Sequence, residues 1–173
     1  MTTTMQEAKK RLFGTDGIRG IPGKHPLDDA TLMSVGRALG SFLRAASEHP
    51  RVVIGMDTRE SGPHIAGEIA RGLAAAGVEP VSAGIVTTPG VAWLVRRDKF
   101  SAGVVISASH NPYHDNGVKL ISSDGMKFPD AIEAEIERMM EELPGASRLP
   151  SVPLPEDTRL HEEYLEEIGR AHV

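Results

Sequence analysis

Residues Val104-Val105-Ile106-Ser107-Ala108-Ser109-His110-Asn111-Pro112 join a continuous apolar run to a polar turn that ends at a proline. A short apolar run without polar alternation is typical of a strand that is buried on both faces of its sheet. Pro112 stiffens the turn because its ring fixes φ and removes a backbone donor. The stretch therefore predicts a buried strand over Gly103–Ser107 that presents Ser109 at the edge of a sheet.

Three further apolar runs have the length of strands, and helical patterns lie between them. We expect these strands at Val52–Met56, Pro80–Ala83 and Val118–Ser122. Residues 64–76 carry apolar side chains at helical spacing and end at Gly77, which suits a left-handed helix terminus. This alternation predicts an α/β domain, a three-layer α/β/α sandwich with a mixed, mostly parallel sheet.

Two more amphipathic helices are expected. The first begins near Asp28 or Asp29, either of which can cap the exposed amides, and it runs to Phe42. Gly36 and Gly40 within it permit close packing. The second follows Pro129, and its apolar positions should face the core: Ile132, Ile136, Met139 and Leu143. Its acidic positions are expected to form a solvated face: Glu133, Glu135, Glu137, Glu141 and Glu142.

The domain is expected to cover residues 1–143. Four prolines between positions 144 and 155 exclude a regular helix, so residues 144–173 are interpreted as a linker and a short helix that buries little. We expect that helix to be the truncated start of a following region. Residues 168–173 can be read from ATC GGA AGA GCA CAC GTC, which resembles a common sequencing-adapter sequence, so the natural protein is expected to continue beyond about Glu167.

Composition narrows the classes of function. The 173 residues are 40% hydrophobic and 25% charged, which fits one soluble globular domain. A formal charge of −5 argues against a broad nucleic-acid-binding face. The absence of cysteine excludes disulfides and thiol chemistry, and no apolar run reaches the 18 residues of a membrane span. We expect a cytoplasmic protein without nucleic-acid or membrane partners.

A glycine-rich segment, Gly14-Thr15-Asp16-Gly17-Ile18-Arg19-Gly20, is the first candidate for ligand binding. Glycines at intervals of three let the backbone fold closely around a ligand. Arg19 adds a planar, permanently charged fork that suits phosphate. A glycine-rich turn that only enters the fold is the alternative.

A second candidate lies at the end of the strand that contains Met56. Asp57 and Ser61 could touch a substrate, because ligands bind at the carboxyl ends of strands in open α/β sheets. They could equally tie the turn and cap the next helix. Arg59 would line the site or brace a neighbouring loop.

The third candidate is Ser109 with the residues that follow it. Asp115-Asn116-Gly117 supports a chain reversal, after which Lys119 could return towards Ser109 and His110. A hydroxyl, an imidazole and an ammonium would then converge, and an ordinary hydrogen-bonded turn is the alternative.

Two other kinds of site are disfavoured for the same loop. The chain lacks the G-x-S-x-G elbow of many serine hydrolases. Pro112 breaks the helical geometry that a metal site at His110 and His114 would need.

Taken in order, the three segments resemble the α-D-phosphohexomutase superfamily from about Lys10 to Leu143. The opening Arg-Leu-Phe-Gly-Thr-Asp-Gly-Ile-Arg-Gly at 11–20 and the run Ser-Ala-Ser-His-Asn-Pro-Tyr-His-Asp-Asn-Gly-Val-Lys at 107–119 are similar to the branch that acts on glucosamine phosphates. The branches that act on mannose or glucose phosphates usually open with Tyr-Asp-Ile-Arg-Gly. The resemblance implies the fold of the first domain of these enzymes.

The resemblance also implies a reaction. Ser109 would carry a phosphoryl group and interconvert glucosamine 6-phosphate and glucosamine 1-phosphate through a 1,6-bisphosphate, on the route to UDP-N-acetylglucosamine and cell-wall precursors. Mg²⁺ would bind the Ser109 phosphate, with its remaining ligands outside this chain. His110 and Lys119 would move protons or neutralise charge. The expected binding and loop-supporting residues are Thr15, Arg19, Arg59 and Asn111.

Some features depart from the family pattern. His114 stands where an aromatic residue is common, and Met56 where a basic residue is common. Relatives have four domains, so we expect this chain alone to be inactive as a mutase. They often associate through this domain, which implies that a homodimer can form. The alternatives are a phosphomannomutase/phosphoglucomutase and a non-catalytic sugar-phosphate-binding module.

Overall fold

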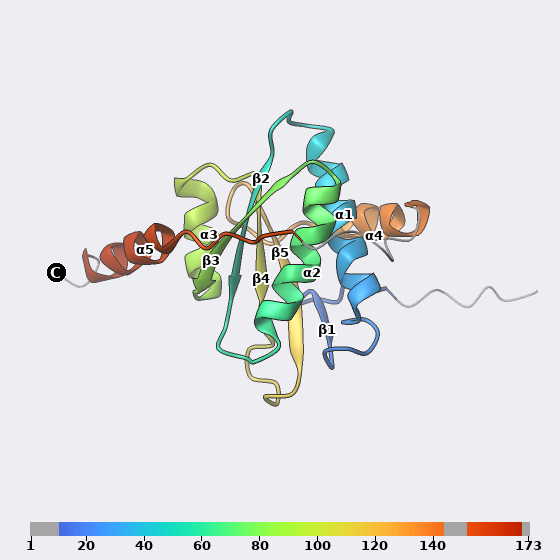
Figure 1. Cartoon of the computed structure of the whole chain (residues 1–173), viewed down its shortest axis with the longest axis horizontal. Coiled ribbons are helices and arrows are strands. Elements are labelled where there is room, and N and C mark those ends of the chain that lie inside the picture. Colours follow the sequence, from blue (N-terminus) through green and yellow to red (C-terminus); the bar gives the residue numbers. More distant parts are fainter. Residues whose placement is uncertain (1–10, 144–151, 171–173) are drawn as a thin grey trace, which may run out of the picture.

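The computed structural model describes residues 11–143 and 152–170, and its centre is one five-stranded sheet (Figure 1). The strands lie in the order β1-β5-β4-β2-β3. Their bounds are β1 Ile18–Gly20, β2 Arg51–Met56, β3 Glu79–Ile85, β4 Ala102–Ile106 and β5 Asn116–Ser122. β2 pairs in parallel with β3 and β4, whereas β5 runs antiparallel to β4 and to β1. The mixed sheet is as expected.

Helices cover both faces of the sheet. Their bounds are α1 Asp29–Arg44, α2 Gly62–Ala75, α3 Thr88–Arg97, α4 Asp130–Glu142 and α5 Thr158–Arg170. Figure 1 shows α1, α2 and α4 on one side of the strands and α3 and α5 on the other, which confirms the three-layer sandwich. None of the helices in the described ranges is long and apolar enough to cross a membrane.

Strand side chains alternate between two apolar clusters. Val52 and Ile54 of β2 contribute to the cluster under α1 and α2, and Val53 between them contributes to the cluster under α3. All three are fully buried. Two covered faces explain why the strands read as continuous apolar runs.

Glycines hold α1 and α2 in close contact. A Cβ atom on Gly36 would lie 2.1 Å from the carbonyl oxygen of Ile69, and one on Gly72 would lie 2.1 Å from that of Met33. Only a residue without a side chain fits at either position. The helix pair therefore forms a rigid layer behind β2.

Two elements were not predicted. β1 lies inside the glycine-rich segment, where it pairs with β5 and extends the sheet. α3 is capped by Thr87, whose hydroxyl accepts a 3.2 Å hydrogen bond from the amide of Gly90. Pro89 and Gly90 usually indicate a turn, so the sequence pattern did not reveal this helix, although proline is well tolerated in a first helical turn.

The C-terminal helix packs on the domain. Leu160 is fully buried in the α3-side cluster, and the Tyr164 hydroxyl lies 2.9 Å from Oγ1 of Thr87. Ahead of it, Pro155 and Asp157 make two 2.9 Å backbone hydrogen bonds with Ser82 on the edge of β3. Residues 144–151 of the expected linker lie outside the described ranges, and the boundary at residue 143 stays a prediction.

The expectation that Glu133 faces solvent is wrong. Glu133 is only 2% exposed, and its Oε2 accepts a 2.7 Å hydrogen bond from Nζ of Lys127. Lys127 precedes the helix and folds back over its first turn, which a helical pattern does not reveal. Burial raises the pKa of Glu133, and the Lys127 ammonium opposes that rise.

We expect the Lys127→Met substitution to destabilise the fold because it leaves the Glu133 charge buried without a partner. The free energy of unfolding at pH 7 should fall by about 2 kcal/mol, less than for a fully enclosed pair because Lys127 is partly exposed. The deficit should shrink as the pH falls through the raised pKa of Glu133 and the carboxyl becomes neutral. Urea unfolding of the wild type and the variant at pH 7 and pH 4.5 measures this loss in the free energy of unfolding. Arg138→Met, in an exposed ion pair, is the control, and equal losses in the two variants would contradict the buried charge.

Asp28 caps α1, as the sequence predicts. Its Oδ1 accepts a 3.1 Å hydrogen bond from the amide of Thr31, and Oδ2 accepts one of 2.8 Å from the Thr31 hydroxyl. Partial burial disfavours the charge, but the hydrogen bonds prevail and hold the pKa of Asp28 below its usual value of 3.8.

The Asp28→Ala variant should lose about 1 kcal/mol of stability at neutral pH because one exposed helix amide loses its acceptor. A lowered pKa in the folded state makes this contribution present above the unfolded pKa, and it is lost as the pH falls through the folded value. Unfolding curves of the wild type and the variant should therefore converge in acid. If the difference in free energy of unfolding between the wild type and Asp28→Ala stays constant from pH 7 to pH 2.5, the Asp28 charge does not stabilise the cap.

Candidate active site

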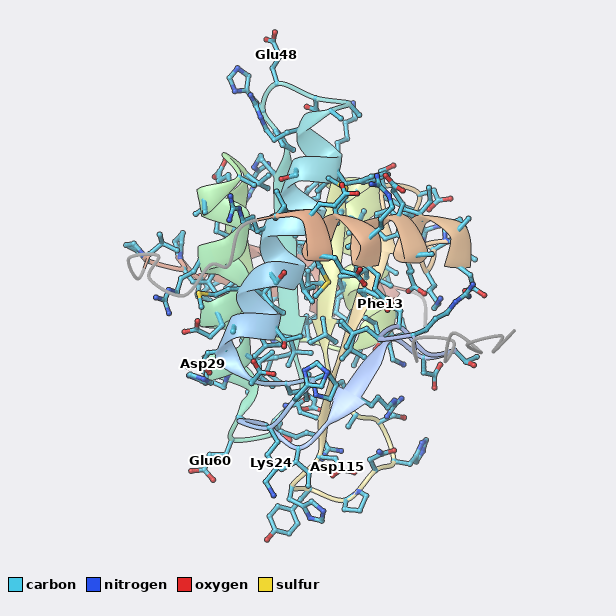
Figure 2. All side chains as sticks on the ribbon, turned by 90° about the vertical axis from the view of Figure 1, so that its right-hand side faces the viewer. Phe13, Lys24, Asp29, Glu48, Glu60 and Asp115 are labelled. Carbon is cyan, nitrogen blue, oxygen red and sulfur yellow. The ribbon has the colours of Figure 1, made fainter. Side chains whose placement is uncertain are left out.

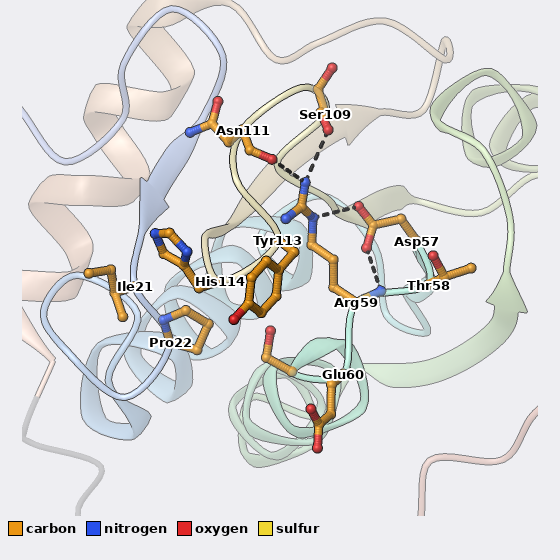
Figure 3. A pocket seen from close by; sticks show the side chains of 11 residues that line it. Ile21, Pro22, Asp57, Thr58, Arg59, Glu60, Ser109, Asn111, Tyr113 and His114 are labelled. Carbon is orange, nitrogen blue, oxygen red and sulfur yellow. Dashed lines mark hydrogen bonds and ion pairs between the residues drawn. The ribbon is translucent and has the colours of Figure 1, made fainter.

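A cavity of about 810 Å³ opens at the carboxyl ends of β1, β2 and β4 (Figure 3). Three loops line it. They contribute Ile21, Pro22, Asp57, Thr58, Arg59, Glu60, Ser61, Ser109, Asn111, Tyr113 and His114. The second and third candidate segments from the sequence therefore meet in one place, as parallel strands require of their carboxyl ends.

The Arg59 guanidinium braces the loop that carries Ser109. Its two terminal nitrogens donate hydrogen bonds of 2.6 to 3.0 Å to four carbonyl oxygens, those of Ser109, Asn111, Pro112 and Asp115. Its Nε donates to Oδ2 of Asp57 at 3.1 Å, and Figure 3 shows this fork between the two loops. The Arg59 side chain is 11% exposed. The donors of Arg59 therefore point into this loop and tie it to the loop that follows β2.

Arg19 supports the same loop from β1. One of its nitrogens donates to the Ala108 carbonyl at 2.5 Å and to Oδ1 of Asn111 at 3.2 Å. The other pairs with Asp16 at 3.2 Å. The glycine-rich segment thus reaches the Ser109 loop through Arg19, and Asn111 holds the loop by its side chain.

Ser109 stands exposed at the start of this loop. Its φ of +54° lies in the left-handed region, which costs a residue with a side chain about 1 kcal/mol. Its amide donates to the Ser107 hydroxyl at 3.1 Å, and its own hydroxyl oxygen lies 2.9 Å from Nδ1 of His110. An exposed hydroxyl beside an imidazole can give up or regain a proton, which group transfer at that oxygen requires.

Asp57 and Ser61 take different roles in the second loop. Asp57 ties the turn, since its Oδ1 accepts a 3.0 Å hydrogen bond from the Arg59 amide. Ser61 makes no side-chain cap with α2. Its hydroxyl instead accepts a 2.9 Å hydrogen bond from Nδ2 of Asn116.

Asn116 is a supporting residue that sequence reasoning missed. It is fully buried, and its Oδ1 accepts a 2.8 Å hydrogen bond from the amide of Gly117. Through Ser61 it joins the start of β5 to the second loop. Its position between Asp115 and Gly117 was interpreted only as a chain reversal, and the sole available signal was an amide side chain at the start of an apolar strand.

Lys119 and Thr15 lie outside the Ser109 cavity. Lys119 pairs with Val105 across β4 and β5, so its side chain shares the α3 face and lines another cavity with Asp16 and Thr88. Thr15 lines a third cavity beside α4. Within the described ranges, no hydrogen bond or ion pair joins either side chain to the Ser109 loop. The convergence of Lys119 with Ser109 stays a prediction.

The histidines of the loop have separate partners. His110 contacts the Ser109 hydroxyl, whereas Nε2 of His114 lies 3.5 Å from Oδ1 of Asp115. His114 also meets Tyr113 edge to face, with ring centres 5.6 Å apart. This arrangement gives the two histidines different surroundings in the loop.

One group of potential metal ligands occurs elsewhere in the described residues. Donor atoms of Asp29, His64 and Glu68 lie within 4.8 Å of one another. Nη1 of Arg71 lies 2.8 Å from both oxygens of Glu68, and Nε2 of His64 lies 2.8 Å from Asp29. Asp29 and His64 also sit in first helical turns, where the helix dipole disfavours a cation. The group fits mutual ion pairing better than it fits Mg²⁺.

We expect the Arg59→Lys variant to loosen the loop because an ammonium cannot reproduce a planar fork to four carbonyls. Tyr113 is 88% exposed within the loop, so chymotrypsin reports loop opening there. Cleavage after Tyr113 should be about tenfold faster than in the wild type, which corresponds to the loss of one net hydrogen bond to a charged group. Arg138→Lys, in an exposed ion pair on α4, should leave the rate unchanged. Equal cleavage rates for Arg59→Lys and the wild type would contradict the bracing role.

Comparison with known proteins agrees with this fold. Residues 10–145 match the family model described as phosphoglucomutase/phosphomannomutase, alpha/beta/alpha domain I. A phosphoglucosamine mutase of Koribacter versatilis is 49% identical over 169 residues, and one of Deinococcus deserti is 49% identical over 142 residues. A crystal structure of a phosphoglucomutase/phosphomannomutase family protein from Burkholderia thailandensis superposes with a TM-score of 0.73 at 30% identity, covering 91% of this chain.

These relatives are much longer than this chain. The alignments cover 94% and 82% of the chain but only 36% and 32% of the two phosphoglucosamine mutases. The chain also covers 35% of the Burkholderia thailandensis protein. The family match spans the whole sheet and all three loops of the cavity. The chain therefore belongs to the phosphoglucomutase/phosphomannomutase family, and its residues 10–145 correspond to the α/β/α domain I of that family.

Proposed function

We propose that this chain supplies the phosphoserine domain of a phosphoglucosamine mutase, which interconverts glucosamine 6-phosphate and glucosamine 1-phosphate. The observation that carries the proposal is the exposed Ser109 hydroxyl, held on a braced loop 2.9 Å from Nδ1 of His110. The relatives that are 49% identical bear this name. The glycine-rich opening at 11–20 adds support, since it resembles the glucosamine-phosphate branch.

In the proposed reaction, a hydroxyl of the sugar phosphate attacks the phosphorus on Ser109. A bond forms between the sugar oxygen and phosphorus, and the bond between phosphorus and Oγ of Ser109 breaks. The proton of the attacking hydroxyl must in net terms reach Oγ, and His110 is close enough to hold or deliver it. The 1,6-bisphosphate then turns round and returns its other phosphoryl group to the same oxygen.

Charge neutralisation is the second requirement. Serine oxygen is a poor leaving group, and Mg²⁺ bound to the phosphate would lower the charge that builds up during transfer. From this chain we propose one ligand, the phosphate on Ser109. Arg19 and Arg59 are committed to loop carbonyls, so we assign them to loop support together with Asn111. We keep Lys119 as a proposed catalytic residue that moves protons or neutralises the phosphate, and Thr15 as a proposed contact to substrate or phosphate; each lines a neighbouring cavity.

The proposal includes the setting of the enzyme. Since one open domain does not enclose a sugar phosphate, we propose that the chain alone is inactive and acts with the regions that its relatives carry. We further propose a cytoplasmic enzyme that can form a homodimer. A phosphomannomutase/phosphoglucomutase is the second candidate, because the Burkholderia thailandensis protein of the same fold belongs to that family. Relative turnover of glucosamine, mannose and glucose phosphates separates the two.

The test uses this domain joined to the remaining domains of a relative. Incubation with glucosamine 1,6-bisphosphate and Mg²⁺ should place a phosphoryl group on Ser109, detected by mass spectrometry of the loop peptide. The Ser109→Ala variant should carry no label and should lose turnover, whereas the exposed control Ser47→Ala should behave as the wild type. Full turnover in Ser109→Ala, or no label in an active enzyme, would refute the proposal. Absence of both label and turnover in the intact protein would favour a sugar-phosphate-binding module.

A further inference from the structure

We infer that Glu137, on a helix outside the Ser109 cavity, is a positioning residue for the glycine-rich turn that leads to Arg19. Its Oε1 accepts a 2.8 Å hydrogen bond from the amide of Leu12, and its Oε2 lies 3.5 Å from the amide of Phe13. The helical pattern predicts Glu137 on a solvated acidic face, but its side chain is half-buried against the entering segment. Figure 2 shows Phe13 beside α4, where the chain enters the domain.

The entering segment has few other backbone partners. Leu12 and Phe13 precede β1, and within the described ranges no backbone carbonyl accepts either amide. The next residues close on themselves, since Gly14 and Gly17 exchange backbone hydrogen bonds of 3.0 and 3.2 Å. The Glu137 carboxylate thus accepts hydrogen bonds from amides that would otherwise need the carbonyls of a neighbouring strand. A charged acceptor makes a hydrogen bond about twice as strong as a neutral one.

A short path of contacts connects this segment to the Ser109 loop. A Cβ atom on Gly17 would lie 2.2 Å from the carbonyl oxygen of Val118, so the turn is seated directly on β5. Two residues later, Arg19 donates to the Ala108 carbonyl and to the Asn111 side chain. In this inference, a shift where the chain enters the domain would move Arg19, a donor that holds the Ser109 loop.

Other acidic residues of α4 have different partners. Glu133 is buried against Lys127, and Glu135 and Glu142 pair with Arg138 on the outer face of the helix. Of these, Glu142 lies one helical turn and a little beyond Glu137, and it is exposed. It is the matched control for loss of a carboxylate from α4.

Hydrogen exchange of this chain, followed by NMR or by mass spectrometry with residue resolution, tests the inference. In Glu137→Ala, the amides of Leu12 and Phe13 should exchange about tenfold faster, with β2 amides unchanged and with no change in Glu142→Ala. Unchanged exchange at Leu12 and Phe13 would overturn the inference. If Glu137→Ala exchanges faster everywhere, Glu137→Gln decides: a local effect at these two amides supports positioning, and a uniform or absent effect refutes it.

The consequence for catalysis rests on the proposed function. In the multidomain enzyme, Glu137→Gln should lower kcat several-fold while leaving KM and the melting temperature close to those of the wild type, and Glu142→Gln should change none of these. An unchanged kcat in an active enzyme would overturn the catalytic consequence. The exchange measurement needs no turnover, so failure of the positioning contact is distinguishable from failure of the proposed reaction.

Discussion

One guanidinium holds the candidate active site together. The loop after β4 turns several carbonyl oxygens inward, and buried or half-buried carbonyls need donors. The planar fork of Arg59 satisfies four of them and is itself anchored by Asp57. This bracing fixes Ser109 in a left-handed conformation that a loose loop would abandon. A hydroxyl presented at a fixed point is the condition for ordered group transfer.

The sheet topology explains why this brace is available. β2 and β4 are neighbours in parallel, so their carboxyl ends and the loops that follow them lie side by side. Arg59 therefore reaches the Ser109 loop from the next strand in the sheet. Antiparallel pairing of β1 with β5 brings Arg19 to the opposite side of the loop. Two arginines from distant parts of the sequence thus donate hydrogen bonds to the same loop. The rigid α1–α2 layer lies behind β2.

Much of this arrangement could be predicted because apolar periodicity records burial. Four of the five strands, the α1 cap and the exposure of Ser109 at a strand end follow from local patterns. Lys119 marks one limit: alternation with Val118 and Leu120, which face α1 and α2, places its side chain on the α3 face, but its approach to Ser109 stays a prediction. Glu133 and Glu137 show a different limit, since a helical pattern marks one face as polar without revealing which segment of chain crosses it.

Bracing by Arg59 and Arg19 requires the Ser109 loop to be as stiff as the strand that carries it. Backbone ¹⁵N relaxation of the wild-type chain measures this most directly, because order parameters report motion of each amide on the picosecond to nanosecond timescale. The amides of residues 109–115, apart from Pro112, should have order parameters of about 0.85, equal to those of β4. Values below about 0.6 in this loop would contradict the account, because a mobile loop cannot hold one hydroxyl in place.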